Sequence, residues 1–308
     1  MFTESQNIAI VRTELDTVFF QQFAYDGTDP GIATARTGQI FKEVPIDRLQ
    51  YIGQINSDVG LWPKIGETQT VPTATPKVAN KWTVQVADFA QSIELSKNLF
   101  DDNMHGVWAN DVSKFARKAL ITQDNNAFAL WRNSFTTQLT ADGVSFINSA
   151  HPLIQGGTTS NVISGALTST TLNSGIIALR TQVDQNNVIQ GGVPSILLVP
   201  PELFKTALEI TESALVSDSG NNALNVYRSA YGIQVWTSPY LGAAAGGSAT
   251  AWWLMTRDNS VIRVVRQGIE TALRDWRYSN NRTYLYQGNF REEVYAPDYC
   301  GVVGSLGT

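Results

Sequence analysis

The chain has 308 residues, 43% of them hydrophobic, with a formal net charge of -5 and an isoelectric point near 5.1. This apolar content is enough for a sizeable core, in one large domain or two to three smaller ones, and it excludes a disordered chain. Binding nucleic acid through its phosphates needs a clustered basic excess, so the acidic balance argues against that class of surface.

No stretch approaches the roughly 18 apolar residues that span a membrane, and the first residues lack the regions of a signal peptide. We therefore expect no membrane contact and a soluble protein made in the cytosol. The single cysteine, Cys300, excludes an internal disulfide and is expected to be a small buried residue.

The first 45 residues are predicted to form an N-terminal arm. Apolar side chains recur at helical spacing from Ile8 to Phe23, and a polar, glycine-containing segment follows at 25–38. Acidic residues outnumber basic ones over the first sixty positions, so this arm would suit a basic neighbouring surface.

A long two-stranded loop with a proline-rich tip is predicted next. Residues 81–87 alternate between apolar and polar side chains, as a strand does, while the prolines before them prevent a central strand there. An isolated hairpin is marginally stable in water, so a projecting one needs a surface to lie on. An ordinary exposed loop is the alternative. The candidate contact residues of this loop are Trp62, Pro63, Pro72, Pro76 and Trp82.

A single long helix is predicted over 105–133, because its apolar residues fall on one helical stripe and no proline interrupts it. Such a helix would be about 43 Å long at about 1.5 Å per residue, far longer than an average helix. We expect it to act as a structural spine. His105 stands at its presumed start beside two aspartates, where capping and dipole interactions account for it.

An α/β unit follows the long helix. A helix is predicted at 168–183, a buried strand at 196–199, a second helix, and a strand at 232–236. Pro200 ends the buried strand because it cannot donate a ladder hydrogen bond, and Pro201 suits the first turn of the next helix.

The last segment is mostly strand, with extended pieces at 252–255, 261–265, 283–286 and 291–295. Half of the arginines lie after Ala251, and no lysine does. Arginine makes rigid bidentate pairs, which favours fixed interfaces. Ordinary cross-strand ion pairs with nearby acids are the alternative. The candidate interface arginines are Arg274, Arg277, Arg282 and Arg291.

The sequence carries no recognisable catalytic constellation. Two histidines, His105 and His151, are too few for a histidine metal cluster, and the Gly-x-Ser-x-Gly and glycine-rich phosphate motifs are absent. The adjacent carboxylates at 101–102 and 292–293 point apart in a helix or a strand, so neither is a natural acid/base pair. We therefore predict no enzyme, no cofactor and no metal site.

The order of these parts resembles the major capsid proteins of tailed bacteriophages, the Hong Kong 97 capsid fold, and in particular the Mu-like major head subunits. The parts follow one another in the order arm, projecting loop, spine helix, α/β unit and returning strands. Together with this order, the segments 146–153, 196–203 and 237–240 carry the resemblance. The resemblance covers nearly the whole chain and is weakest in the first forty residues.

The resemblance implies an α+β fold with an N-terminal arm, an extended β-hairpin loop, a peripheral domain carrying the long spine helix, and an axial α/β domain. The loop would lie across a neighbouring subunit's peripheral domain, and the axial domain would crowd around fivefold and sixfold axes. The implied boundaries are 1–45 for the arm, 56–92 for the extended loop, 46–55, 93–152 and 268–297 for the peripheral domain, and 153–267 and 298–308 for the axial domain.

The implied function is a head subunit that self-assembles through hexamers and pentamers into an icosahedral shell. That shell would enclose double-stranded DNA without sequence-specific binding, as part of a virion made in the bacterial host cytoplasm. Portal and decoration proteins are implied partners, and a scaffold is expected as a separate protein because the chain begins almost directly with the arm. Some members crosslink a loop lysine to an asparagine; Lys64, Lys77 and Lys81 are present, but nothing in the sequence supports such a bond.

Three other classes stay open at this point. An encapsulin-like nanocompartment shell shares the fold and would contain cargo protein instead of DNA. A secreted hydrolase with a long loop over a cleft would be a monomer with a ligand pocket. A tail or baseplate protein would form tubes or rings instead of closed shells.

Overall fold

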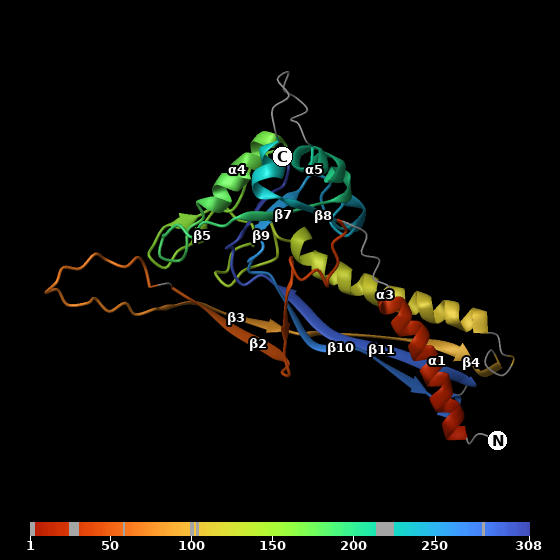
Figure 1. The fold of residues 1–308 in the computed structure, drawn as a ribbon. Helices are drawn as coiled ribbons and strands as arrows, with labels where there is room; N and C mark the ends of the chain where they lie inside the picture. The colour runs from red at the N-terminus through yellow and green to blue at the C-terminus, as the bar shows by residue number, and fades with distance from the viewer. Residues whose placement is uncertain are drawn as a thin grey trace.

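The computed structural model describes residues 4–24, 31–57, 59–98, 102, 105–213, 225–278 and 281–308. In these residues the strands form two four-stranded sheets and two smaller two-stranded ones. One four-stranded sheet lies in the lower half of Figure 1 and the other in the upper half, and the ribbon of β2 and β3 projects sideways from the lower half.

The helices are α1 (Glu4–Ala24), α3 (His105–Arg132), α4 (Ser169–Arg180) and α5 (Phe204–Thr211), with short turns η1 (Pro201–Leu203), η2 (Tyr227–Tyr231), η3 (Ala243–Ala245) and η4 (Trp276–Tyr278). The strands are β1 (Lys42–Pro45), β2 (Gln50–Asn56), β3 (Val78–Gln85), β4 (Ala87–Ser96), β5 (His151–Pro152), β6 (Thr158–Thr159), β7 (Pro194–Val199), β8 (Gln234–Thr237), β9 (Trp252–Thr256), β10 (Ile262–Arg274), β11 (Thr283–Tyr295) and β12 (Val302–Ser305). The mixture of helices and sheets confirms the predicted α+β class.

The lower sheet has the strand order β1-β10-β11-β4 and is built on two 13-residue strands, β10 and β11. The sequence predicts shorter pieces here, at 261–265, 283–286 and 291–295. In the structure the last two are one continuous strand, and β10 runs on to Arg274. Irregular register after Val265 and again after Gln267 separates the first half of β10 from a second half whose burial alternates regularly to Arg274.

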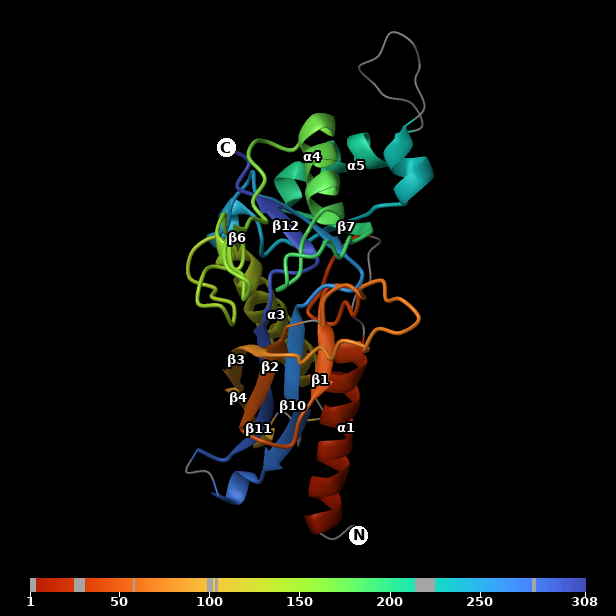
Figure 2. The same cartoon turned by 90° about the vertical axis from the view of Figure 1, so that its left-hand side faces the viewer.

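Helix α1 packs on the chain's own lower sheet and on α3 (Figure 2). Leu15 and Phe19 are fully buried there. The carboxylate of Asp16 accepts hydrogen bonds from Thr271 Oγ1 and Tyr286 Oη, both at 2.7 Å. Through Asp16, the acidic arm therefore hydrogen-bonds to hydroxyl groups of its own subunit. The arm's boundary remains a prediction.

Helix α3 spans 28 residues, as the apolar stripe predicts. Trp108, Val112 and Phe115 in its first half pack with α1 and the lower sheet. Phe128 and Trp131 in its second half enter the core that contains the upper sheet. The side chain of His105 is not among those that the structure describes, so its capping role stays a prediction.

The upper sheet has the order β12-β9-β7-β8, and β7 pairs in parallel with β8 and antiparallel with β9. All four residues from Ile196 to Val199 are 0% exposed, because apolar clusters cover both faces of β7. The strand ends before Pro200, and Pro201 begins η1, which leads directly into α5. The predicted strand-to-helix transition is therefore observed, with a 3-10 turn first.

We expect Leu198→Ala in β7 to lower the free energy of unfolding by about 2–5 kcal/mol, because it leaves a cavity in a strand covered on both faces. Urea denaturation of the unassembled subunit measures this loss. The matched control is Ile177→Ala on α4, where the side chain is 54% exposed and the change should stay within about 0.5 kcal/mol. Equal losses in both variants would contradict the assignment of β7 to the core.

Candidate assembly surfaces

The projecting ribbon consists of β2, β3 and the described residues of the tip between them, 57 and 59–77 (Figure 1). The tip is closed at its base, where Ser57 N–H donates to Lys77 O at 2.7 Å and Lys77 N–H donates to Ser57 Oγ at 2.9 Å. Pro63, Pro72 and Pro76 all lie in this tip, outside the strands, and all are exposed.

Large apolar side chains gather at the tip. Trp62 is 92% exposed, Leu61 79% and Val71 69%. Together with Pro63 and Pro72 they line a cavity of about 650 Å³. Exposed apolar residues scattered singly are normal, but a contiguous patch on a projecting element marks an interaction surface. We call residues 59–74 the apolar tip.

Trp82 has a different position from the other candidate loop residues. It lies in β3 at the base of the ribbon and is half-buried. Its ring centroid is 5.2 Å from that of Tyr51 in β2 and 5.5 Å from that of Tyr295 in β11. Trp82 therefore connects the ribbon to the lower sheet within one subunit.

The candidate arginines do not form one patch. Arg291 pairs with Asp88 on the neighbouring strand β4, and this contact lowers the pKa of the Asp88 carboxyl. Arg277 Nε lies 2.6 Å from Asp275 Oδ2, on the turn that joins β10 to β11. Arg291 thus follows the alternative of a cross-strand ion pair. Arg274 and Arg282 are exposed near the same turn, and the Arg282 guanidinium lies 5.9 Å from the Trp276 ring centroid.

A buried charged group centred on Arg263, a residue that the sequence did not single out, joins the arm segment to the lower sheet. Arg263, 6% exposed, donates to Glu292 Oε2 from Nε at 3.1 Å and from Nη2 at 2.5 Å. Its Nη1 donates to Glu43 of β1 at 3.3 Å. Gln123 of α3 donates to the same Glu292 oxygen at 3.3 Å and accepts from Arg36 at 3.4 Å. The group therefore links segments far apart in sequence.

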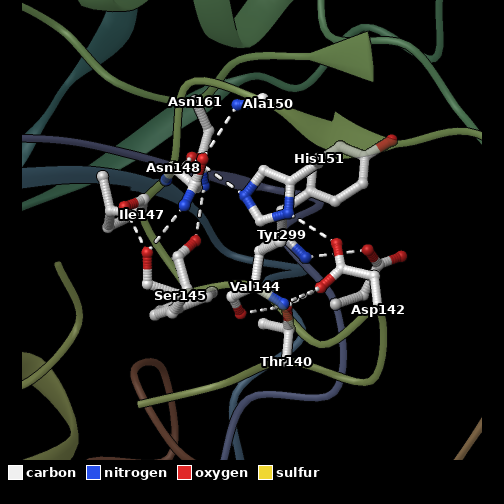
Figure 3. A network of polar contacts seen from close by, with 12 residues as sticks. Thr140, Asp142, Val144, Ser145, Ile147, Asn148, Ala150, His151, Asn161 and Tyr299 are labelled. Carbon is white, nitrogen blue, oxygen red and sulfur yellow. Dashed lines mark hydrogen bonds and ion pairs between the residues drawn. The ribbon is translucent and has the colours of Figure 1, made fainter. Parts of the chain in front are cut away.

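His151 is the centre of a second buried polar group, shown in Figure 3. It is 0% exposed, its Nδ1 lies 2.6 Å from Asp142 Oδ2, and its Nε2 lies 3.2 Å from Asn161 Oδ1. Its ring stacks on Tyr299 at 4.5 Å. Both ring nitrogens have partners within the protein, so this histidine holds loops together and offers no free nitrogen as a base.

Burial by itself would raise the pKa of Asp142, but hydrogen bonds from His151, Thr140 and Val144 outweigh it and hold that pKa below its usual value. Burial raises the pKa of Cys300, with nearby Asp298 adding to the shift. The thiol therefore stays protonated and is a poor nucleophile. Cys300 is partly buried, less so than predicted.

The described residues contain no group of three or more His, Cys, Asp or Glu side chains that could hold a metal ion. None of the described helices combines the length and the apolar character needed to cross a bilayer. The described surfaces therefore consist of a projecting apolar tip and paired charges, and the buried polar groups hold segments of the chain in place.

The phage capsid protein family model matches residues 80–304, which is most of the chain. The chain therefore belongs to the phage capsid protein family. It is a major capsid protein with the Hong Kong 97 fold, a structural subunit of a virion, as the sequence predicts. Families of this kind are structural and not normally enzymatic. The Mu-like detail remains a prediction.

Three solved structures illustrate the likeness in fold. The procapsid of bacteriophage JBD30 has 14% identity and a TM-score of 0.52, covering 99% of this chain and 76% of that chain. The virus-like particle from Pyrococcus furiosus has 9% identity and a TM-score of 0.55, covering 95% and 98%. The capsid of the native GTA particle has 15% identity and a TM-score of 0.54, covering 91% and 93%. No curated protein matches the sequence.

We expect Asp142→Asn to destabilise the subunit at pH 7 by about 1–3 kcal/mol, because it replaces a charge-assisted contact of buried His151. The folded-state pKa of Asp142 is depressed. Its contribution is therefore present above the ordinary aspartate pKa of about 3.9 and is lost as pH falls through the folded value. The stability gap between wild type and variant should accordingly shrink below about pH 4.

Denaturant titrations between pH 3 and pH 8 measure this gap. Asp47→Asn is the control, because the Asp47 side chain is 96% exposed and its nearest ionic partner, Arg48, is 4.0 Å away. A gap for Asp142→Asn that widens on acidification would contradict the assignment.

Proposed function

We propose that this chain self-assembles through hexamers and pentamers into a closed icosahedral head that encloses packaged double-stranded DNA. In that head the apolar tip of one subunit docks on the peripheral domain of its neighbour, and the axial domain meets its copies around the fivefold and sixfold axes. The single observation that carries the proposal is the apolar tip, where Trp62 is 92% exposed on an element that projects from the body (Figure 1). Burying such a patch favours association strongly.

The proposed division into a peripheral and an axial domain follows from the resemblance, and the two four-stranded sheets support it, but β10 (Ile262–Arg274) crosses the boundary at 267/268 and β4 (Ala87–Ser96) the boundary at 92/93. The lower sheet with α3 would belong to the peripheral domain, and the upper sheet with α4 and α5 to the axial domain. Arg274, Arg277 and Arg282 would contribute to contacts between peripheral domains from the exposed turn after β10.

The net charge of -5 supports an enclosure that repels DNA weakly instead of gripping it. A closed shell needs a passage through which DNA enters, so a portal is a proposed partner, together with a separate scaffold and decoration proteins. The proposal also includes synthesis in the bacterial host cytoplasm and no catalytic activity. The family match favours a phage head over an encapsulin-like compartment, a secreted hydrolase or a tail or baseplate protein.

We expect the double variant Leu61→Ser, Val71→Ser to lose at least tenfold in its yield of closed particles, because it removes apolar area that docking would bury. The unassembled subunit should keep its thermal midpoint, since both side chains are exposed, at 79% and 69%. Negative-stain microscopy and sedimentation velocity of the purified full chain measure the yield.

The control is Thr68→Ser, Thr70→Ser in the same exposed tip, which should assemble like wild type. Removing residues 62–76 should abolish or deform assembly while leaving the subunit folded. Normal particles from that deletion would refute the role of the tip.

A further inference from the structure

The ribbon is connected to the lower sheet at two points of the chain, through residues 46–49 after β1 and through Val86 before β4. Strands β3 and β4 are separated only by Val86, yet β3 pairs with β2 whereas β4 pairs with β11. Val86 N–H donates to Leu49 O at 3.2 Å, and the Val86 side chain is buried. The chain therefore changes partner at this residue, and the direction of the ribbon depends on what packs around it (Figure 1).

Trp82 lies four residues from this change of partner and directly opposite Gly53 in the β2–β3 register. Its indole ring lies so close to Gly53 that a Cβ there would stand 2.2 Å from ring atom Cζ2. Gly53 is not among the described residues with positive φ, so the need for glycine is steric. Any side chain at position 53 would have to displace the ring.

The Trp82 ring also contacts the lower sheet. It meets Tyr51 edge-on at an interplanar angle of 67° and lies tilted by 34° on Tyr295, the last residue of β11. The cluster continues through the buried residues Val84, Val86 and Val264. On the opposite face of the ribbon, by contrast, Ile52 is 67% exposed. The ribbon is thus supported on one face, where Trp82 and Tyr51 pack on the cluster that contains Val264 of the lower sheet, and Trp82 also contacts Tyr295 of β11.

We infer that Trp82 and Gly53 are positioning residues that set the direction in which the apolar tip leaves the subunit, and with it the curvature of the shell. This inference rests on the proposed function. The chain from Gly53 to Leu61 spans at most about 27 Å when extended, so a rotation of about 10° at the base moves the tip by up to about 5 Å. Packed contacts lose their attraction within a much smaller gap, so the docking geometry depends on the base.

The direction of the ribbon can be measured without assembly. Spin labels at Lys77→Cys and Lys118→Cys, in a Cys300→Ser background, report the distance between ribbon and α3 in unassembled subunits. We expect one narrow distribution for the parent, at least a twofold broadening with Trp82→Ala, and a narrow distribution with Trp82→Phe, which keeps an aromatic ring. An unchanged distribution in Trp82→Ala would overturn the inference.

A paired substitution tests the link to the shell. Gly53→Ala should reduce the yield of shells of normal diameter at least tenfold and shift the remainder to other diameters, as seen by negative-stain microscopy. In a Trp82→Ala background the indole ring is gone, so adding Gly53→Ala should lower the yield of shells of normal diameter by less than a further twofold. The control is Gly66→Ala in the tip, where the nearest atom to the added Cβ is Gln69 Cδ at 4.0 Å.

Two outcomes would refute the positioning role while leaving the proposed function intact. One is that Gly53→Ala alone forms shells like those of wild type. The other is that Gly53→Ala lowers the yield of normal shells by the same factor in the Trp82→Ala background as it does alone. If the wild-type chain itself forms no shells, the proposed function fails instead. The distance measurement still decides the local role of Trp82 in that case.

Discussion

The packing of Trp131 at the end of α3 is the contact on which the rest of the subunit depends. Trp131 is fully buried, with ring centroids 5.9 Å from Trp253 of β9 and 5.7 Å from Phe146. One turn earlier, Phe128 meets Phe41, which precedes β1, at 5.5 Å. The first half of the same helix lies on the lower sheet, so one rigid rod is embedded in both cores. Because packed interiors resist deformation, the lower sheet and the upper sheet keep a fixed relation.

The buried charges around Arg263 have another role. Replacing a buried ion pair with apolar residues is often neutral or stabilising, so such a pair is weak grounds for stability. Arg263 does, however, contact Glu292 of β11 and Glu43 of β1, and Glu292 also accepts from Gln123 of α3. Other pairings would leave a buried charge without a partner, which is costly. The apolar contacts therefore supply the stability, and this group specifies where the arm segment attaches.

The sequence predicts those features whose signal is local. The apolar run of β7, the proline pair after it and the stripe of α3 are each read from neighbouring residues, and the structure has all three. The second half of β10 is missed because the register shifts after Val265 and Gln267 break the pattern between the two halves of the strand, although the second half itself alternates. The sequence places Trp82 among the interface residues of the loop, and its contact with Gly53, which depends on strand register between distant segments, is visible only in the structure. The contacts of Asp142 with His151 likewise depend on how two loops meet, which no periodic pattern records.

The division between tip and base of the ribbon has a consequence for assembly. Apolar surface at the tip is non-directional, so it supplies affinity without fixing an angle. An interface that repeats head to tail closes into a ring or a shell only if the angle between subunits is constant, and otherwise it forms open filaments. In the proposed head, the constant angle comes from the base, where an indole ring fills the space above a glycine and touches the sheet. In that proposed head, affinity and curvature are therefore encoded at opposite ends of one ribbon, so substitutions at the two ends should fail in different ways.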